Sequence, residues 1–197
     1  IYAAGSFTTI SGLTRPFVAA INSITGLPTS WRPVPNASVL TVNPLSGVVY
    51  LGGTFTTLGP FTGAGVPLDL ATGVKLATFP KITGTVSTVI PDGGGGWYVG
   101  GTFTDIDGIT RNNIAHINPN GTLDQTWNPS ANAAVTALAL SGMTLYAGGS
   151  FTAIGIQSRA RLAAIDTTTG IANSWSSGTD AAVSSILIDG SNICVAG

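Results

Sequence analysis

Tyr98-Val99-Gly100-Gly101-Thr102-Phe103-Thr104 recurs along the chain in near copies at one fixed interval. The other complete copies are Tyr2-Ala3-Ala4-Gly5-Ser6-Phe7-Thr8, Tyr50-Leu51-Gly52-Gly53-Thr54-Phe55-Thr56 and Tyr146-Ala147-Gly148-Gly149-Ser150-Phe151-Thr152. Their tyrosines stand at positions 2, 50, 98 and 146, so the position number rises by 48 each time. A fifth copy begins as Ile193-Cys194-Val195-Ala196-Gly197, with Cys194 in place of the tyrosine. A period in the forties indicates a repeat architecture.

The repeated stretch has the pattern of a β-strand covered on both sides. Alternation places Tyr98, Gly100 and Thr102 on one face, and Val99, Gly101 and Phe103 on the other. Both faces carry apolar groups, so both should be buried. The paired glycines predict a bulge or a close approach of a neighbouring backbone, because a side chain there would hold the neighbour away.

Three further segments complete each period. A second strand is expected at 17–21, 66–70, 114–117 and 162–165, with Pro67 making the second period the least regular because proline removes a ladder donor. A third, short strand carries one aromatic residue at a constant phase: Trp31, Phe79, Trp127 and Trp175. A β-branched fourth strand is expected at 39–42, 86–90, 135–140 and 183–188. Turns at Asn43-Pro44, Asp92-Gly93, Ser141-Gly142 and Asp189-Gly190 then lead into the next repeated stretch.

The composition supports an all-β chain. Charged residues make up 8% of the 197 residues, against about 25% in an average soluble protein. All the acidic residues are Asp, and Lys and Arg are few, so good helix formers are scarce. Helical repeats would also need a 3.6-residue apolar spacing that is absent, and one-strand solenoid coils use shorter periods. Four short antiparallel strands in every period of 48 predict a β-propeller built from four-stranded blades.

The repeats fall at 2–49, 50–97, 98–145 and 146–193, with the start of a fifth at 194–197. The chain therefore shows five copies of the repeated strand, whereas four closed periods would need four. We expect residues 1–197 to be one segment of a larger propeller with further blades. A strand exchange that closes a small ring is the alternative.

The net charge argues against some classes of partner, and the cysteine content excludes some kinds of site. The net charge of −1 offers no basic field for phosphate backbones or anionic lipids, so nucleic acid is not expected as a partner. Cys194 is the only cysteine, which excludes an internal disulfide and a cysteine-rich zinc site. No apolar run reaches the length of about 18 residues that a transmembrane segment needs. The Lys-poor, Ser/Thr-rich composition favours an extracellular or cell-surface location.

The third period carries a recognisable series of motifs. Gly101-Thr102-Phe103-Thr104 is followed by Arg111-Asn112-Asn113-Ile114-Ala115-His116-Ile117-Asn118, Asn120-Gly121-Thr122-Leu123-Asp124, Trp127-Asn128-Pro129 and Val135-Thr136-Ala137-Leu138. This series resembles the bacterial delta-60 repeat; the other periods match it at fewer landmarks. The resemblance implies a β-propeller in a large, often secreted or surface-attached bacterial protein. It brings no agreed catalytic residues.

Arg15, Arg111 and Arg159 are the candidate ligand-binding residues, because they recur at one phase of the repeat; Gly63 takes that place in the second period. They could form a ring of guanidinium groups suited to carboxylate or phosphate ligands. The alternative, which we favour, is that each arginine ties down an adjoining loop by bonding backbone carbonyls.

Asp105 and Asp107 are the candidate metal ligands, because Asp105-Ile106-Asp107-Gly108 has two carboxylates and a glycine turn, as in part of a calcium loop. An Asx turn is the favoured interpretation. His116, the only histidine, stands where the first and fourth periods have alanine, and we expect it to fill space in a strand. Gly93 to Gly96 lack the Lys-Ser of a phosphate-binding loop and predict a loose turn.

These observations favour a non-catalytic scaffold, or an adhesion or binding module, of a secreted or cell-surface bacterial protein. Its ligand would be a protein or a carbohydrate held by loops on one face, with no cofactor and no catalytic residue. One alternative is a hydrolase or lyase-type enzyme whose site lies at the central opening, built from the three arginines and an Asp. Another is a structural subunit of an extracellular filament or surface layer that assembles with itself.

Overall fold

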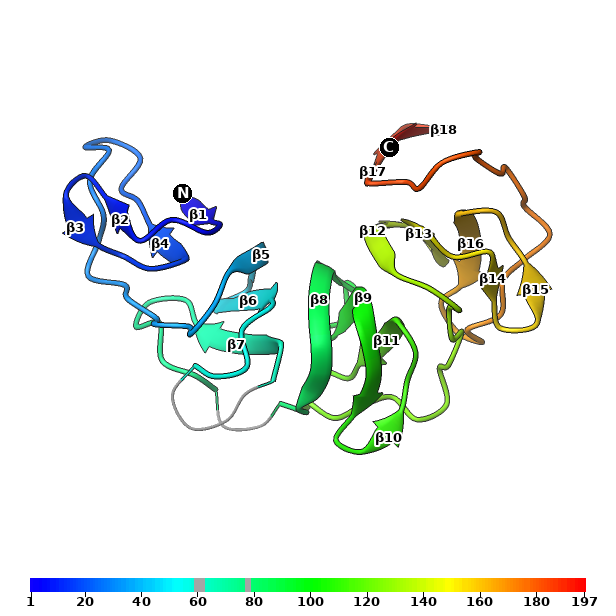
Figure 1. The fold of residues 1–197 in the computed structure, drawn as a ribbon, viewed down its shortest axis with the longest axis horizontal. Coiled ribbons are helices and arrows are strands. Elements are labelled where there is room, and N and C mark those ends of the chain that lie inside the picture. Colours follow the sequence, from blue (N-terminus) through cyan, green and yellow to red (C-terminus); the bar gives the residue numbers. More distant parts are fainter. Residues whose placement is uncertain (59–62, 77–78) are drawn as a thin grey trace.

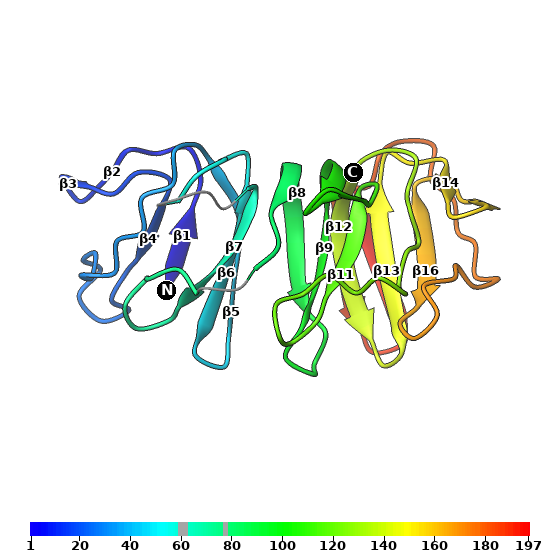
Figure 2. The same cartoon turned by 90° about the horizontal axis from the view of Figure 1, so that it is seen from below.

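The computed structural model describes residues 1–58, 63–76 and 79–197, and within these ranges every regular element is a β-strand (Figure 1). This confirms the predicted all-β class. The strands form successive antiparallel sheets that follow one another along an open arc (Figure 1) and stand side by side when the arc is seen from below (Figure 2). In the described part of the chain, no helix has the length and apolar character that crossing a membrane would need.

Each sheet is called a blade here and is numbered along the chain. The first blade pairs β1 (Tyr2–Ala4) with β4 (Val18–Ala20). The second joins β5 (Val39–Leu45), β6 (Val48–Gly53) and β7 (Gly65–Asp69). The third joins β8 (Ile82–Pro91), β9 (Trp97–Ile106), β10 (Ile109–Thr110) and β11 (Ile114–Ile117). The fourth joins β12 (Val135–Ser141), β13 (Thr144–Gly149) and β16 (Leu162–Asp166), and the fifth pairs β17 (Ser185–Asp189) with β18 (Asn192–Ala196).

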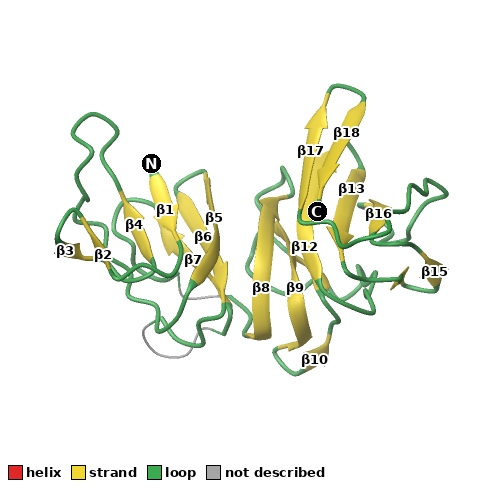
Figure 3. Cartoon of the chain, turned by 45° about the horizontal axis from the view of Figure 1, so that its top comes forward, coloured by secondary structure: helices red, strands yellow, loops and turns green. Residues whose placement is uncertain are grey.

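Each complete blade combines strands from two consecutive periods. The inner strand, such as β8, is the fourth segment of one period, and it pairs with the repeated stretch of the next period, here β9. Short hairpins project from the strand ends: β2 (Thr9–Ile10) with β3 (Leu13–Thr14), and β14 (Ala153–Ile154) with β15 (Gln157–Ser158). Figure 3 shows the β17–β18 hairpin at the end of the arc opposite to β2 and β3.

The repeated stretch is buried on both sides, as predicted. In β9, Tyr98 is 4% exposed and Val99 is fully buried. Tyr98 belongs to a core cluster with Trp127 and Phe151, whereas Val99 belongs to a second cluster on the other side. The hydrophobic core therefore lies between successive blades.

The paired glycines have the predicted role. A Cβ atom on Gly101 would collide with the backbone carbonyl of Thr85, next to a β-bulge between Val86 and Thr88. A Cβ atom on Gly100 would lie 2.8 Å from the Cγ1 atom of Val135, in the next blade. One glycine thus allows the bulge, and the other allows the next blade to approach.

The predicted third strand is wrong. Each third segment contributes only an isolated bridge to its blade: Ile21 with Pro28, Leu68 with Lys75, Ile117 with Leu123, and Ile165 with Ala172. The physical reason is local competition for the backbone donors. The amide N–H groups of Thr126 and Trp127 donate to the carboxylate of Asp124 instead of to a strand.

Two predictions about prolines are also wrong. The turn expected at Asn43-Pro44 lies at Ser46-Gly47, where both residues have positive φ (45° and 84°), as a two-residue hairpin turn requires. Leu45 and Val48 form the pair that flanks this turn, and Pro44 is one residue further from it. In an antiparallel ladder the N–H of such a residue points away from the paired strand, so proline at position 44 removes no hydrogen bond to β6. β7 is a regular five-residue strand despite Pro67, because Pro67 faces the outer edge, where its carbonyl accepts from Leu76 N.

Candidate functional site

The three arginines share one hydrogen-bonding pattern. Arg111, 5% exposed, donates through Nη1 to Thr110 O (2.9 Å) and through Nη2 to Asp124 O (3.2 Å) and Gln125 O (2.9 Å). Arg15 bonds Thr14 O and Thr29 O in the same way. Arg159 bonds Ser158 O and Asn173 O. Each guanidinium group therefore ties a third segment to its blade, as the favoured interpretation predicts.

The two candidate metal ligands support the β8–β9 edge. Asp105 Oδ1 accepts hydrogen bonds from Thr83 Oγ1 (3.2 Å) and Gly108 N (3.2 Å). Asp107 Oδ1 accepts from Lys81 N (2.8 Å). Nowhere in residues 1–58, 63–76 and 79–197 do three His, Cys, Asp or Glu side chains gather closely enough to hold a metal ion. The structure thus gives each of these two carboxylates a hydrogen-bonding role in the hairpin.

A cavity of about 370 Å³ lies between the second and third blades, near the turns that join their strands. Its apolar lining includes Leu45, Val48, Pro67, Phe79, Trp97 and Pro119. Its polar lining includes Ser46, Asn118 and Asn120. Small-molecule sites in proteins have volumes of roughly 300 to 1,000 Å³ and combine mostly apolar walls with a few polar groups. The cavity has both properties.

Trp97 forms the wall of the cavity that belongs to β9. The side chain is 6% exposed and lies against Tyr50 of the second blade, with ring centroids 5.4 Å apart. The indole N–H groups of Trp31 and Trp127 donate to the carbonyls of Asp69 and Asp166. That of Trp97 has no hydrogen-bond partner among the described residues. Trp97 therefore keeps an indole donor that no described residue uses.

Trp97 was not among the predicted site residues, although its position in the repeat carries a signal. The same phase of the repeat holds Ile1, Val49, Leu145 and Ile193, all aliphatic. One indole in a series of aliphatic residues places a larger side chain in a single blade interface. A search for departures from the repeat, instead of agreement with it, would have found this position.

A glycine-rich turn forms another wall. Gly95 lines the cavity, and both Gly93 and Gly95 have positive φ (85° and 100°). Asp92 holds this turn, because its Oδ1 accepts from Gly94 N (2.7 Å) and Gly96 N (2.8 Å). The predicted loose turn is thus fixed by one carboxylate, and Gly95 adds no side chain to the cavity.

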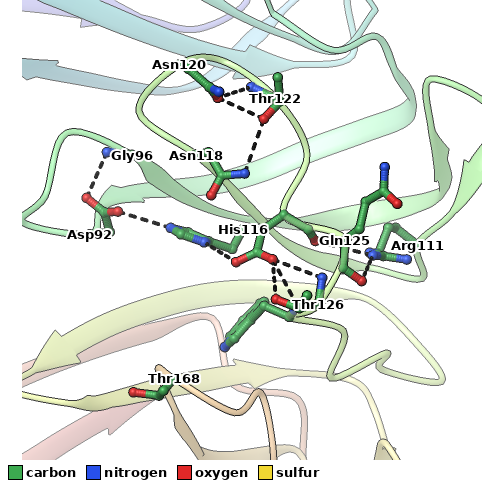
Figure 4. Close-up of polar contacts among 12 residues, drawn as sticks. Asp92, Gly96, Arg111, His116, Asn118, Asn120, Thr122, Gln125, Thr126 and Thr168 are labelled. Atoms are coloured by element: carbon green, nitrogen blue, oxygen red, sulfur yellow. Dashed lines mark hydrogen bonds and ion pairs between the residues drawn. The ribbon is translucent and has the colours of Figure 1, made fainter.

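His116 connects this turn to the third segment (Figure 4). Its Nε2 lies 3.0 Å from Asp92 Oδ2, and its Nδ1 lies 3.1 Å from Asp124 Oδ2. The imidazole also stacks on Tyr98 with ring centroids 4.6 Å apart. An imidazolium can donate at both nitrogens, whereas a neutral imidazole can donate at only one.

Hydrogen bonding stabilises the charged form of both carboxylates. Burial alone would raise the pKa of Asp124, but hydrogen bonds from Thr126 and His116 outweigh it and hold this pKa at about 2. Burial opposes the charge on Asp92 too, yet bonds from His116 and the glycine turn lower its pKa. Burial, together with the two negative charges, raises the pKa of Tyr98 to about 12.

The expectation that His116 only fills space missed this network. Alanine at the same phase in the first and fourth blades cannot bridge carboxylates, and position 92 corresponds to Pro44, Leu140 and Ile188 in other periods. The third blade alone combines a histidine at this phase, His116, with Asp92 and Asp124. That coincidence of three departures from the repeat is the signal that could have revealed the network.

Comparison with known proteins supports the fold. Residues 95–126 match the model of a family described as a domain of unknown function (DUF5122) β-propeller. No curated protein matches the chain. Among solved structures, the chain is similar to two computationally designed proteins. For Ika4 the identity is 16% and the TM-score 0.57, over 81% of this chain and 85% of that chain. For Ika8 the identity is 16% and the TM-score 0.63. The match covers 90% of this chain and 48%, about half, of that chain.

The WD40 β-propeller domain of Doa1 is 10% identical, with a TM-score of 0.48 over 90% of this chain and 67% of that chain. The family match and the designed proteins agree with the stacked sheets described above, so the chain has a β-propeller-like fold.

Proposed function

We propose that this chain is a non-catalytic β-propeller binding module, of the delta-60 repeat type, in a secreted or cell-surface bacterial protein. Its ligand occupies the cavity between the second and third blades. The observation that carries this proposal is the cavity itself: a volume of about 370 Å³ lined by a tryptophan whose N–H group has no partner in the described chain.

The site is built on rigid elements, which favours recognition. Trp97 belongs to a ten-residue strand that is paired on both sides, by β8 and by β11. Pro67 lies in β7, and Asp92 fixes the glycine-rich turn through two backbone bonds. A pocket held in shape before binding loses little conformational entropy when a ligand enters.

The polar groups around the cavity support binding more than catalysis. Both nitrogens of His116 face carboxylates, so neither is directed at a substrate as a general base. The terminal nitrogens of Arg15, Arg111 and Arg159 donate to backbone carbonyls, so these guanidinium groups are engaged within their own blades. The extracellular or cell-surface location rests on the composition and on the resemblance to delta-60 repeats.

The test is to probe the complete chain against an array of oligosaccharides and an array of peptides, before and after the cavity is blocked. Asn120→Trp places an indole at the exposed mouth of the cavity. Thr168→Trp is the matched control, because Thr168 stands one period later, on the fourth blade, and does not line the cavity.

Binding that is lost in Asn120→Trp and kept in Thr168→Trp supports the proposal. No binding on either array, or binding that both variants keep, contradicts it. Turnover of any bound compound by the purified chain would contradict the non-catalytic part.

A further inference from the structure

The polar groups of the cavity mouth are arranged by one hydroxyl. Thr122 Oγ1 accepts a hydrogen bond from Asn118 Nδ2 (3.2 Å) and donates one to Asn120 Oδ1 (2.8 Å) (Figure 4). These bonds fix the orientation of both amides. They leave Asn118 Oδ1, an acceptor, and Asn120 Nδ2, a donor, without a hydrogen bond to any described residue.

An acceptor and a donor on either side of Thr122 match the chemistry of hydroxyl groups. A hydroxyl donates one hydrogen bond and accepts others, so two hydroxyls can each use one of these two amide atoms. Trp97 of β9 lines the same cavity, and its indole N–H is a further donor without a partner among the described residues. The cavity therefore offers both kinds of polar partner beside a largely apolar surface.

The apolar surface suits the C–H face of a sugar ring. Trp97 and Phe79 present aromatic side chains to the cavity, and Pro67 and Pro119 add flat aliphatic surface. Aromatic rings have an electron-rich face that attracts weakly positive C–H groups, and a large ring buries much surface at a small entropy cost. The C–H groups of a pyranose can pack on such a wall while its hydroxyls point to the mouth.

The charge of the site decides the class of sugar. None of the described residues that line the cavity is charged. An anionic sugar would lose hydration on entry and gain no counter-charge, which is unfavourable. A neutral sugar carries no charge that would need a counter-charge.

We propose that the cavity binds one residue of an uncharged glycan, with its C–H face against Trp97 and its hydroxyls on Asn118 and Asn120. This inference rests on the proposed function and names the ligand class of the same site. A proline-rich peptide is the competing occupant, since such peptides dock on aromatic-lined grooves. The uncharged amides in the lining of the cavity favour the sugar.

The experiment titrates the complete chain with the methyl glycosides of glucose, galactose, mannose and N-acetylglucosamine, followed by saturation-transfer NMR. Methyl glucuronide serves as the charged probe and a polyproline peptide as the competitor. At least one neutral glycoside should bind, with saturation strongest on the protons of one ring face. Methyl glucuronide should bind at least about tenfold more weakly, the factor expected for an uncompensated charge.

Variants of Asn118 and Asn120 distinguish specific recognition of the glycoside from nonspecific binding. Asn118→Ala combined with Asn120→Ala should weaken glycoside binding by about tenfold, which corresponds to the loss of hydrogen bonds to the ligand. Thr168→Ala, at the same phase of the fourth blade, should leave binding unchanged. Thermal melts of all variants show whether the fold is retained.

Binding of a neutral glycoside that the double variant weakens supports the inference. If only the polyproline peptide binds, and Asn120→Trp blocks it, the sugar is the wrong ligand class while the proposed function stands. If none of these probes binds, the assignment to an uncharged glycan fails, and the two arrays decide whether the proposed function stands. Glycoside binding that the double variant leaves unchanged overturns the assignment to Asn118 and Asn120.

Discussion

His116 joins two carboxylates that come from consecutive periods but meet in the third blade. Asp92 directly follows β8, the inner strand of the third blade, and caps the glycine-rich turn, whereas Asp124 caps the third segment before Trp127. The histidine lies between them and stacks on Tyr98. One side chain thus connects a wall of the cavity to the anchor of the neighbouring interface.

This residue-scale network predicts acid sensitivity. The folded pKa of Asp124, about 2, lies below its ordinary value of 3.8, and that of Asp92 is also lowered. Such groups stabilise the fold fully above the unfolded pKa, and this contribution is lost as the pH falls from 3.8 through the folded pKa. Urea unfolding of the wild type should therefore show a falling free energy of unfolding over that range.

Asp124→Asn is the comparison for that prediction. An amide does not titrate there, so the variant should be less stable at neutral pH and should show a shallower loss on acidification. Equal pH slopes for the wild type and the variant would show that Asp124 does not contribute as described.

The sequence alone could not reveal the network, because its members are neighbours only after folding. Asp92 and His116 are separated by 24 residues and meet because β9 pairs with both β8 and β11. The spacing that revealed the repeat carries no information about a contact that a single blade makes. Arg111 differs, since its role in tying down a loop was the favoured interpretation and its bonds to backbone carbonyls agree with it.

At the scale of elements, the repeat predicted most strands correctly, but the predictions about the third segment and about two prolines were wrong. The repeated stretch, the second strand and the fourth strand all appear in the blades. Pro44 and Pro67 misled the prediction because the effect of a proline depends on which side its missing N–H would face. The third segment is not a ladder strand because residues such as Asp124 take up its backbone donors.

The third segments still anchor the blades, through their aromatic residues. Trp127 is 1% exposed, lies 5.1 Å from the ring of Tyr98 and donates to Asp166 O in the fourth blade. Trp127→Ala should lower the free energy of unfolding by about 3 to 5 kcal/mol, the usual range for a buried tryptophan. Urea denaturation measures this change.

Trp175 is the matched control at the same phase. It contacts Tyr146 with ring centroids 5.4 Å apart but is only partly buried. Its replacement by alanine should therefore cost clearly less than that of Trp127. Equal losses for the two variants would mean that burial between blades is not the source of the stabilisation.

At the scale of the whole molecule, the blades stack because each repeated stretch leaves room for the next inner strand. Gly52, Gly100 and Gly148 stand one period apart, and a Cβ atom on each would crowd Val86, Val135 and Val183 of the following blade. The arrangement is periodic, so the sequence could predict it. The cavity could not be predicted in the same way, because it arises where Trp97 breaks the pattern.

The most direct measurement of this stacking is the set of nuclear Overhauser contacts between valine methyl groups and glycine α-protons. Contacts from Val86 to Gly52, from Val135 to Gly100 and from Val183 to Gly148 are all predicted, because these pairs meet at successive blade interfaces. Strand pairing within each sheet without these three contacts would contradict the account.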